Sequence, residues 1–417
     1  MSTAETPARG EPLPRRSDLA HHWGLDPSVV FLNHGSFGAT PLVALERQQE
    51  FRARMEAEPI RFVVTQLEGL LDEARAFVAA FVGCNPDDLA FVHNATMGVN
   101  TILRSLDFAP GDEIVTSAHE YNACNNVIDY VAQRTGARVV RAEIPFPMTS
   151  EDEVVGAILS VVTPRTRLVL LSHITSPTAL VLPVERIVRE LNERGIDTLV
   201  DGAHAPGMLD LNVERIGAAY YTGNLHKWAC APKGSAFLWV RRDRQHLIRP
   251  LIISHGANSP RTDRSRFRLE MDFLGTMDFS AWLATPEAIR AVGAMVPGGW
   301  PEVRHRNRDL ALASRDLISR ELAAAGVPNA DVRAAPDSMV GSMAIVGLPD
   351  RAPGETPQPS RYHDPLHDRL IDRWHVQVPI VPFPAPPRRW LRISAHLYNT
   401  LDQYAHLARA LIAECRS

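Results

Sequence analysis

Short apolar runs alternate with helix-like segments through residues 40–290. A helix-like segment carries apolar side chains three or four positions apart, as residues 67–81 do before Gly83, and glycine often ends a helix. A short apolar run bounded by turn residues is typical of a buried strand. The runs that we predict as strands are 89–92, 113–116, 137–140, 167–171, 198–200, 219–222 and 235–240.

This alternation predicts an α/β fold whose central sheet is mostly parallel and covered by helices on both faces. After residue 290 long helices rich in arginine and alanine follow, and apolar runs near 343–346 and 391–394 predict a small mixed sheet. Residues 348–363 are rich in proline and are expected to form a loop, and residues 401–415 a closing helix. Ligands of parallel sheets bind at the carboxyl ends of the strands, so the residues after each strand bear most on function.

Composition limits the possible functions. The chain has 417 residues, of which 45% are apolar and 22% charged, and its formal net charge is −4. These values exclude a disordered or fibrous chain and allow two domains. There is no basic excess, so we expect neither a nucleic-acid nor a membrane partner. The four cysteines are scattered without a Cys-x-x-Cys pair, so we predict no metal site. The N-terminus lacks a continuous apolar stretch, so we expect a cytoplasmic protein.

Two strand ends carry an acid and a lysine. Asp201 directly follows the run 198–200, and Lys227 follows the run 219–222 between a histidine and a tryptophan. Each residue has an ordinary alternative explanation: Asp201 as a helix N-cap and Lys227 as a surface lysine. Together, on consecutive strands, they indicate pyridoxal phosphate (PLP) chemistry. That chemistry requires a lysine for a Schiff base and an acid that keeps the pyridinium nitrogen protonated.

PLP also requires a phosphate cradle, and helix N-termini suit that task. The segment 93–98 lies between a predicted strand and a helix expected to begin near Thr96. Thr96 offers a hydroxyl, and the backbone amides of Ala95 to Met97 offer donors. We therefore predict that this turn holds the phosphate.

Further segments extend the pattern over nearly the whole chain beyond its N-terminal arm: FLNHGSFG, FVHNATMGVN, HEYNA, SHITSPTALVLP, DGAHAPG, TGNLHKW, GTMD and LRISAHLYNT. They resemble, in the same order, the fold-type I PLP-dependent enzymes of the class V aminotransferase and cysteine desulfurase group. NHGSFG and HKW resemble its isopenicillin N epimerase-like branch. The resemblance implies a mostly parallel seven-stranded central sheet with a smaller α+β domain. We expect a flexible arm at 1–18, a large PLP-binding domain at 40–290, and a small domain built from 19–39 and 291–417.

The resemblance also assigns roles to single residues. Lys227 is expected to form the Schiff base and to carry the proton at the substrate Cα. Asp201 is expected to pair with the pyridinium nitrogen, His204 to contact the cofactor's phenolic oxygen, and Arg392 to grip the substrate carboxylate. The other cofactor-binding residues that it implies are Ala95, Thr96, Met97, Tyr121 (stacked on the cofactor face), His173, Asn224, His226 and Thr276.

A second subunit is implied as well. Thr276 matches a phosphate contact that the family usually receives from the partner subunit, so we expect a homodimer with shared active sites. Asn33, His34 and Ser36 are expected to line the pocket for a small amino-acid-type substrate. Arg61 is expected to reach in from the neighbour.

Three reactions at Cα remain open. We expect an isopenicillin N epimerase-like epimerase or racemase. The alternatives are a C–S lyase of cysteine or a cysteine conjugate, of the hercynylcysteine sulfoxide lyase type, and a class V aminotransferase. The stretch 376–384 carries no cysteine, which disfavours a desulfurase that carries sulfur on the enzyme. A catalytically silent binding protein would be expected to lack Lys227.

Overall fold

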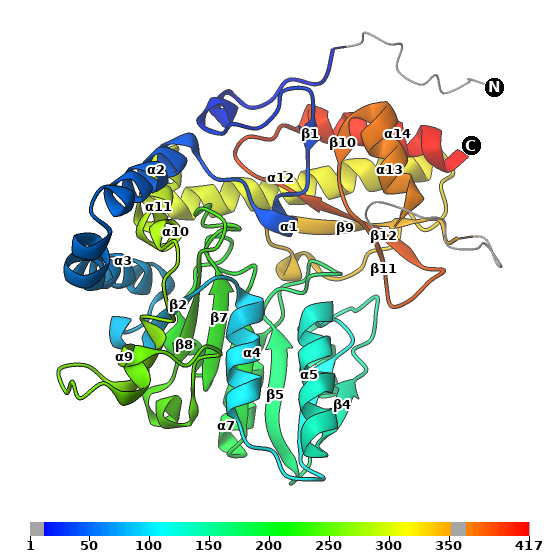
Figure 1. Ribbon diagram of the computed structural model, residues 1–417. Helices are drawn as coiled ribbons and strands as arrows, with labels where there is room; N and C mark the ends of the chain where they lie inside the picture. The colour runs from blue at the N-terminus through cyan, green and yellow to red at the C-terminus, as the bar shows by residue number, and fades with distance from the viewer. Residues whose placement is uncertain (1–11, 352–363, 417) are drawn as a thin grey trace.

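The computed structural model describes residues 12–351 and 364–416 (Figure 1). The structure does not describe residues 1–11 of the predicted arm or residues 352–363 of the predicted loop. Two described residues of the predicted arm, Ser17 and Arg16, are hydrogen-bonded to later parts of the chain. The amide of Ser17 donates to the carbonyl of Tyr398 at 3.2 Å, and Arg16 donates to the carbonyl of Leu25 at 2.9 Å.

A seven-stranded sheet forms the centre of the larger part. Its strand order is β2-β8-β7-β6-β5-β3-β4, and β8 alone runs antiparallel to its two neighbours. This confirms the predicted mostly parallel sheet. The strands are β2 (Leu89–Val92), β3 (Glu113–Ser117), β4 (Arg138–Ala142), β5 (Thr166–Ser172), β6 (Asp197–Asp201), β7 (Tyr220–Asn224) and β8 (Ala236–Val240).

Helices cover both faces of this sheet because its strands are apolar on both faces. Leu170 packs into the core formed with α4 (Ala95–Ser105) and α5 (Asn122–Thr135), and its neighbour Leu171 packs into the core on the opposite face. Successive strand residues alternate in direction, so one apolar run supplies both cores. The opposite core includes α3 (Leu67–Val82), α6 (Glu151–Ser160) and α7 (Val184–Glu193), and α3 ends at Gly83 in the left-handed conformation.

The smaller part packs above the carboxyl end of the sheet (Figure 1). Its three strands, β9 (Met343–Leu348), β11 (Ile380–Pro382) and β12 (Arg389–Ser394), are wholly antiparallel, so the prediction of a mixed sheet was wrong. The parallel pairing forms elsewhere, between β1 (Val30–Phe31) and β10 (Val376–Gln377). The helices of this part are α12 (Gly299–Ala324), α13 (Pro365–Trp374) and α14 (Leu401–Arg416).

The remaining helices are short or lie at the flank of the large sheet. Helices α10 (Ser280–Leu283) and α11 (Thr285–Ala294) pack beside α3, and α2 (Leu42–Ala57) packs on α10 and α11. The others are α1 (His34–Phe37), α8 (Val213–Ile216), α9 (Arg266–Met271) and the turns η1 (Asp18–His22), η2 (Arg61–Gln66), η3 (Pro86–Asp88), η4 (Arg242–Leu247), η5 (His255–Asn258) and η6 (Asp337–Met339). Among the described residues, no helix is long and apolar enough to span a bilayer.

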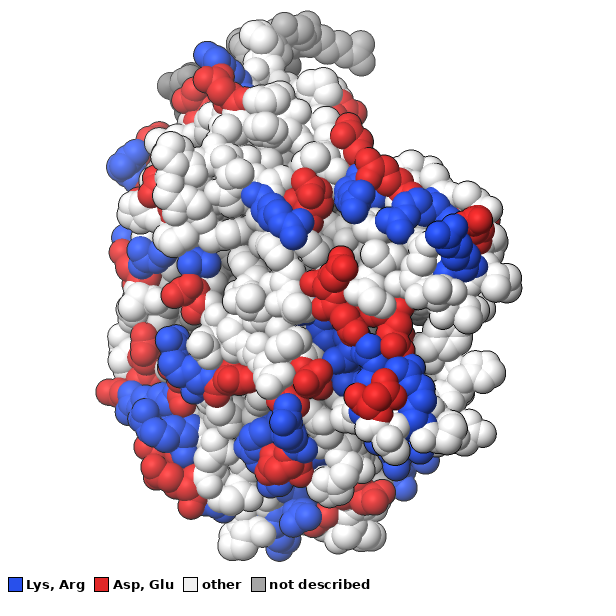
Figure 2. All heavy atoms as spheres, turned by 90° about the vertical axis from the view of Figure 1, so that its left-hand side faces the viewer, with Lys and Arg blue, Asp and Glu red and all other residues white. Residues whose placement is uncertain are grey.

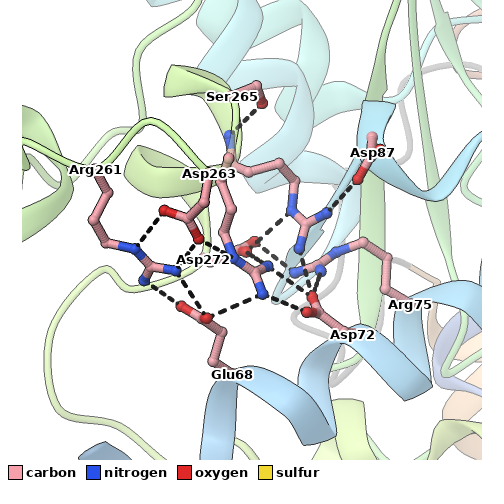
Figure 3. Close-up of polar contacts among 10 residues, drawn as sticks. Glu68, Asp72, Arg75, Asp87, Arg261, Asp263, Ser265 and Asp272 are labelled. Atoms are coloured by element: carbon pink, nitrogen blue, oxygen red, sulfur yellow. Dashed lines mark hydrogen bonds and ion pairs between the residues drawn. The ribbon is translucent and has the colours of Figure 1, made fainter.

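Charged side chains of both signs are interspersed over the flank that carries α2 and α3 (Figure 2). This flank carries a network of ion pairs that we call the α3–α9 network (Figure 3). It joins α3 to α9 and to the loop before α9, and one of its arginines, Arg75, is only 1% exposed. Its other members are Glu68, Asp72, Asp87, Arg261, Asp263, Arg264, Arg268 and Asp272.

Candidate active site

A cavity of about 330 Å³ opens at the carboxyl end of the central sheet. Its wall comes from the loops that follow β2, β3, β5, β6 and β7, and from the NHGSFG segment near the N-terminus. Ligands of open α/β sheets bind at this end. The predicted site residues in the wall are Ser36, Ala95, Thr96, Tyr121, Asp201, His204, Asn224, His226 and Lys227, and Phe37, His93, Asn94, Ser172, Ile174, Ser176, Ala203 and Gly234 complete it.

Lys227 follows β7 and points its Nζ at His204, with 3.2 Å between Nζ and Nε2. Burial, reinforced by the positive charge of Arg392, lowers the pKa of Lys227 to about 7. The NHGSFG segment packs directly on this turn. Gly38 has φ +71°, and a Cβ there would collide with the carbonyl oxygen of His226. A lysine that is partly neutral near pH 7 can act as a nucleophile and as a base.

His204 is buried as a neutral ring. Burial, together with the positive charge of Lys227, holds its pKa well below the usual range. The indole N–H of Trp228 donates to Nδ1 at 3.4 Å, which leaves the ring proton on Nε2. Nε2–H therefore faces Lys227 Nζ as a donor, which favours the neutral amine.

Asp201 closes the floor of the cavity at the end of β6. One carboxylate oxygen accepts from the amide of Ala203 at 2.9 Å, and the other accepts from the thiol of Cys124 at 3.3 Å. Burial raises the pKa of Asp201, while these hydrogen bonds and the charge of Lys227 lower it. Asp201 can therefore accept a hydrogen bond from a donor group of a ligand that enters the cavity.

The turn before α4 forms another part of the cavity wall. The side chain of Asn94 caps α4 by accepting from the Met97 amide at 2.8 Å, and the side chain of Asn224 accepts from the Ala95 amide at 2.8 Å. Two of the three predicted phosphate donors are thus engaged by side chains. Thr96 is the residue of this turn that keeps both a hydroxyl and an amide for the predicted phosphate contact.

His226 lies beside this turn. Its Nδ1 donates to the carbonyl of Ser235 at 2.9 Å, and burial, with the charge of Lys227, lowers its pKa to about 4. A phosphate dianion would favour the protonated ring and reverse this shift.

Arg392 enters the site from β12 of the smaller part. One nitrogen donates to the carbonyl of Ser176 at 2.5 Å and another to the hydroxyl of Ser36 at 3.0 Å. Ser36 in turn donates to the side chain of Asn33 at 2.6 Å. The guanidinium is therefore held in one orientation at the cavity edge, and it is only 5% exposed.

Residues 30–318 match the aminotransferase class-V family. The chain belongs to this family. It is therefore a PLP-dependent enzyme of fold type I, as the sequence motifs predicted. The match covers every residue of the cavity wall.

Named relatives fall into two groups. The chain is 37% identical to an isopenicillin N epimerase from Amycolatopsis lactamdurans, over 93% of this chain and 95% of the epimerase. It is 27% identical to a probable chloroplastic L-cysteine desulfhydrase from Arabidopsis thaliana, over 95% and 84%. Among solved structures, the cystine C–S lyase C-DES in complex with cysteine persulfide matches with a TM-score of 0.75 at 21% identity, over 92% of this chain and 97% of that one. This last similarity supports the fold.

The described cavity fits PLP on its own chemistry. Its wall contains a buried acid, a hydroxyl at a helix N-terminus, and a lysine of lowered pKa. These are the groups that a pyridine nitrogen, a phosphate and an aldehyde require.

Seven predicted residues lie outside the cavity wall. Three of them, Met97, Asn33 and Arg392, are hydrogen-bonded to wall residues. The other four are His34, His173, Arg61 and Thr276. His34 is buried, with Nε2 3.0 Å from the Lys227 carbonyl and Nδ1 2.8 Å from the Tyr398 hydroxyl, so it supports the lysine turn from behind. His173 is also behind the wall, with its Nδ1 2.9 Å from the hydroxyl of Tyr221. Arg61 pairs with Glu58 at the surface, and Thr276 is exposed. The partner-subunit roles of Arg61 and Thr276 stay predictions.

The structure adds residues that the motifs did not single out. Cys124 and Glu120 lie beside Asp201, and Ser176 holds Arg392. The sequence could have indicated two of them, because Glu120 lies in the HEYNA segment beside Tyr121 and Cys124 directly follows that segment. A further signal is the lysine count: Lys227 and Lys233 are the only lysines in the chain.

Proposed function

We propose that the enzyme is an epimerase at the Cα of an amino-acid-type substrate, of the isopenicillin N epimerase kind. The observation that carries this proposal is the 37% identity to that epimerase over 93% of the chain. The cavity supports it, since a base of suitable pKa lies beside the predicted cofactor position.

The residues then have distinct tasks. Bound PLP supplies an electron sink for a carbanion at Cα. Lys227 Nζ, neutral above a pKa of about 7, exchanges the proton on one face of Cα, and inversion requires a second acid–base group on the opposite face. Asp201 holds the proton of the ring nitrogen, and Arg392 binds the substrate carboxylate and so orients Cα toward Lys227. His204 donates to Nζ and keeps the lysine in place.

A C–S lyase is the second candidate function. It is supported by the desulfhydrase relative, which is 27% identical over 95% of this chain. This reaction needs only Lys227 as base and a thiol as leaving group. The cysteine-free stretch 376–384 supports direct release of sulfur rather than its transfer to the enzyme.

One experiment separates these reactions. The holoenzyme is incubated in D₂O with a panel of amino acids, cysteine, cysteine conjugates and peptides with a free α-amino acid end. Epimerisation predicts deuterium at Cα together with inversion, and lysis predicts pyruvate and a free thiol. Transamination predicts a keto acid with the amine form of the cofactor. Deuterium uptake without inversion on every substrate would contradict the epimerase proposal.

We also propose that the enzyme is a homodimer whose partner completes each site. Several large apolar side chains are exposed: Phe37 of the cavity wall at 67%, Ile60 and Val64 between α2 and α3 at 77% and 75%, and Ile253 before η5 at 63%. Exposed apolar groups of this kind are typical of subunit contacts. Light scattering tests the mass in solution.

Mixed dimers test whether the site is shared. Thr276→Ala and Lys227→Ala subunits, refolded together, should regain activity because one site per mixed dimer combines an intact Lys227 with an intact Thr276. Mixing that restores nothing would contradict a shared site.

A cytoplasmic location is likewise a proposal, supported by the four cysteines, all of which are free thiols.

A further inference from the structure

Glu120 is a buried acid directly behind the predicted ring-nitrogen site. It lies in the turn between β3 and α5 and is only 4% exposed. Strand β5 lies between β3 and β6 in the sheet, and Ser172 on β5 is paired in register with Asp201 on β6. The carboxyl ends of three neighbouring strands therefore place Glu120, Ser172 and Asp201 together.

The two carboxylate oxygens of Glu120 differ. Oε1 accepts from the Tyr121 amide at 2.8 Å and from the Ser172 hydroxyl at 2.8 Å. Oε2 is buried and has no hydrogen-bond partner among the described residues. A buried carboxylate oxygen without a donor is costly when it carries charge. Oε2 is therefore the oxygen suited to carry a proton.

The neighbours of Glu120 on other elements do not compensate a second negative charge. One oxygen each of Glu120 and Asp201 and the sulfur of Cys124 all lie within 4.8 Å of one another. The Cys124 thiol donates to Asp201, so it keeps its proton. The two positive charges of the site act on other groups. Lys227 lowers the pKa of Asp201, and Arg392 lowers the pKa of Lys227.

Two buried carboxylates this close cannot both ionise readily. Asp201 has a backbone amide, a thiol and the charge of Lys227 to favour its ionised form. The ionised form of Glu120 is favoured by the amide of Tyr121 and by the hydroxyl and backbone of Ser172. Burial, with the charge of Asp201, raises the pKa of Glu120 to about 8. The proton of the pair thus belongs on Glu120.

We propose that Glu120 is a positioning residue of the cofactor site, held as a neutral carboxylic acid so that Asp201 carries the only negative charge of the pair. Its Oε1 also fixes the turn that presents Tyr121 to the cavity. The inference rests on the proposed placement of Asp201 at the cofactor's ring nitrogen.

Infrared difference spectroscopy tests the protonation state directly. Glu120→Gln keeps the shape and a permanently neutral group, and Asp201→Asn is the matched control. At pH 7 we expect the wild-type holoenzyme minus Glu120→Gln to show the C=O stretch of a protonated carboxyl. Wild type minus Asp201→Asn should show carboxylate bands. Carboxylate bands in the Glu120→Gln difference would overturn the proposal. This spectrum does not depend on the reaction catalysed, so it can fail or succeed independently of the proposed function.

PLP affinity provides the second measurement. Glu120→Gln should bind PLP within about threefold of wild type at pH 7, because a neutral group replaces a neutral group. Glu120→Ala should lose about tenfold, since the Tyr121 amide and the Ser172 hydroxyl lose their acceptor. Between pH 7 and 9 the wild-type affinity should rise relative to Glu120→Gln, because ionised Glu120 attracts a ring-nitrogen cation. A Glu120→Gln variant as weak as Asp201→Asn, or an unchanged relative pH profile, would contradict the proposal.

Discussion

The enzyme buries charge in two regions, and it treats the charge differently in each. In the α3–α9 network every buried guanidinium meets carboxylates (Figure 3). Arg75 contacts Asp72 at 2.6 Å and Asp272 at 2.5 Å, and Arg268 contacts Asp72 at 2.6 Å and Asp87 at 2.9 Å. The pKa of Asp72 falls well below its usual value against the effect of its own burial because three arginines surround it, whereas burial raises the pKa of Asp272.

In the active site, burial instead drives groups toward neutrality. Lys227 lies against His204, a ring that has itself lost its charge, and its pKa falls to about 7. Glu120 faces Asp201 rather than a cation. Charge that is matched within the protein stabilises the fold, whereas groups held near neutrality are available to a charged ligand. This difference separates the two regions without reference to any relative.

The largest expected effect comes from removing the lysine of the site. Lys227→Ala should abolish the visible absorption of the lysine-bound cofactor and reduce turnover by about a thousandfold or more, because nucleophile and base are lost together. Absorption spectra and initial rates measure both losses.

Lys233 is a matched control because it is the chain's other lysine. Its Nζ donates to the carbonyl of Gly38 at 3.1 Å, and the residue is exposed and lies outside the cavity wall. Lys233→Met should keep the visible band. Borohydride reduction of the wild-type holoenzyme should attach the cofactor to the peptide with Lys227. Attachment to Lys233 would contradict the assignment.

Breaking the α3–α9 network should affect stability and not chemistry. Arg75→Met leaves Asp272 buried without its closest guanidinium, and such losses cost about 3–5 kcal/mol. The free energy of unfolding in urea measures the loss, and KM and kcat of the folded fraction should stay unchanged.

Arg261→Ala is the matched control at the rim of the same network. This arginine is 42% exposed, and exposed ion pairs contribute about 1 kcal/mol or less. If both variants lose the same stability, burial does not govern the energy of the network.

The sequence predicts the parts of this molecule that local pattern determines. The run 89–92 is recovered as β2 because an apolar strand buried on both faces leaves a clear signature. Asp201 and Lys227 reach one cavity because Asp201 ends β6 and Lys227 follows the neighbouring strand β7. The pairing direction of β9, β11 and β12 depends instead on which segments meet in space, and local pattern does not encode that.

The same limit applies inside the site. The Met97 amide was predicted as a phosphate donor, but Asn94 accepts from it as the cap of α4. His34 was expected in the pocket, but the short α1 turns it toward Tyr398 and the Lys227 carbonyl. Motif matching locates a residue along the chain, and tertiary contacts decide which way its side chain faces.

Removing Arg392 should weaken substrate binding more than cofactor binding. A charge-assisted contact to a carboxylate contributes roughly 1.5–3 kcal/mol, so Arg392→Ala should raise KM by about ten- to a hundredfold. Arg388→Ala is the control, since Arg388 lies on the same segment, is 52% exposed and pairs with Asp350. Release of PLP with unchanged KM would reassign Arg392 to the cofactor.

The smallest effect concerns the charge that Arg392 exerts on Lys227. Cofactor-free protein should capture PLP faster as pH rises through about 7, because the neutral fraction of the Lys227 amine increases there. Burial is the main cause of the lowered pKa, and Arg392 is the second. Removing the guanidinium by Arg392→Ala should therefore raise the pKa of Lys227 and move the midpoint of capture to higher pH, by about one unit or less.

Stopped-flow absorbance across the pH range measures this midpoint, and Arg388→Ala should leave it in place. A midpoint that stays fixed in Arg392→Ala would mean that burial alone sets the pKa, and a downward shift would contradict the electrostatic argument. An upward shift would show that the substrate-binding arginine also keeps the lysine reactive, so that one buried charge serves two steps.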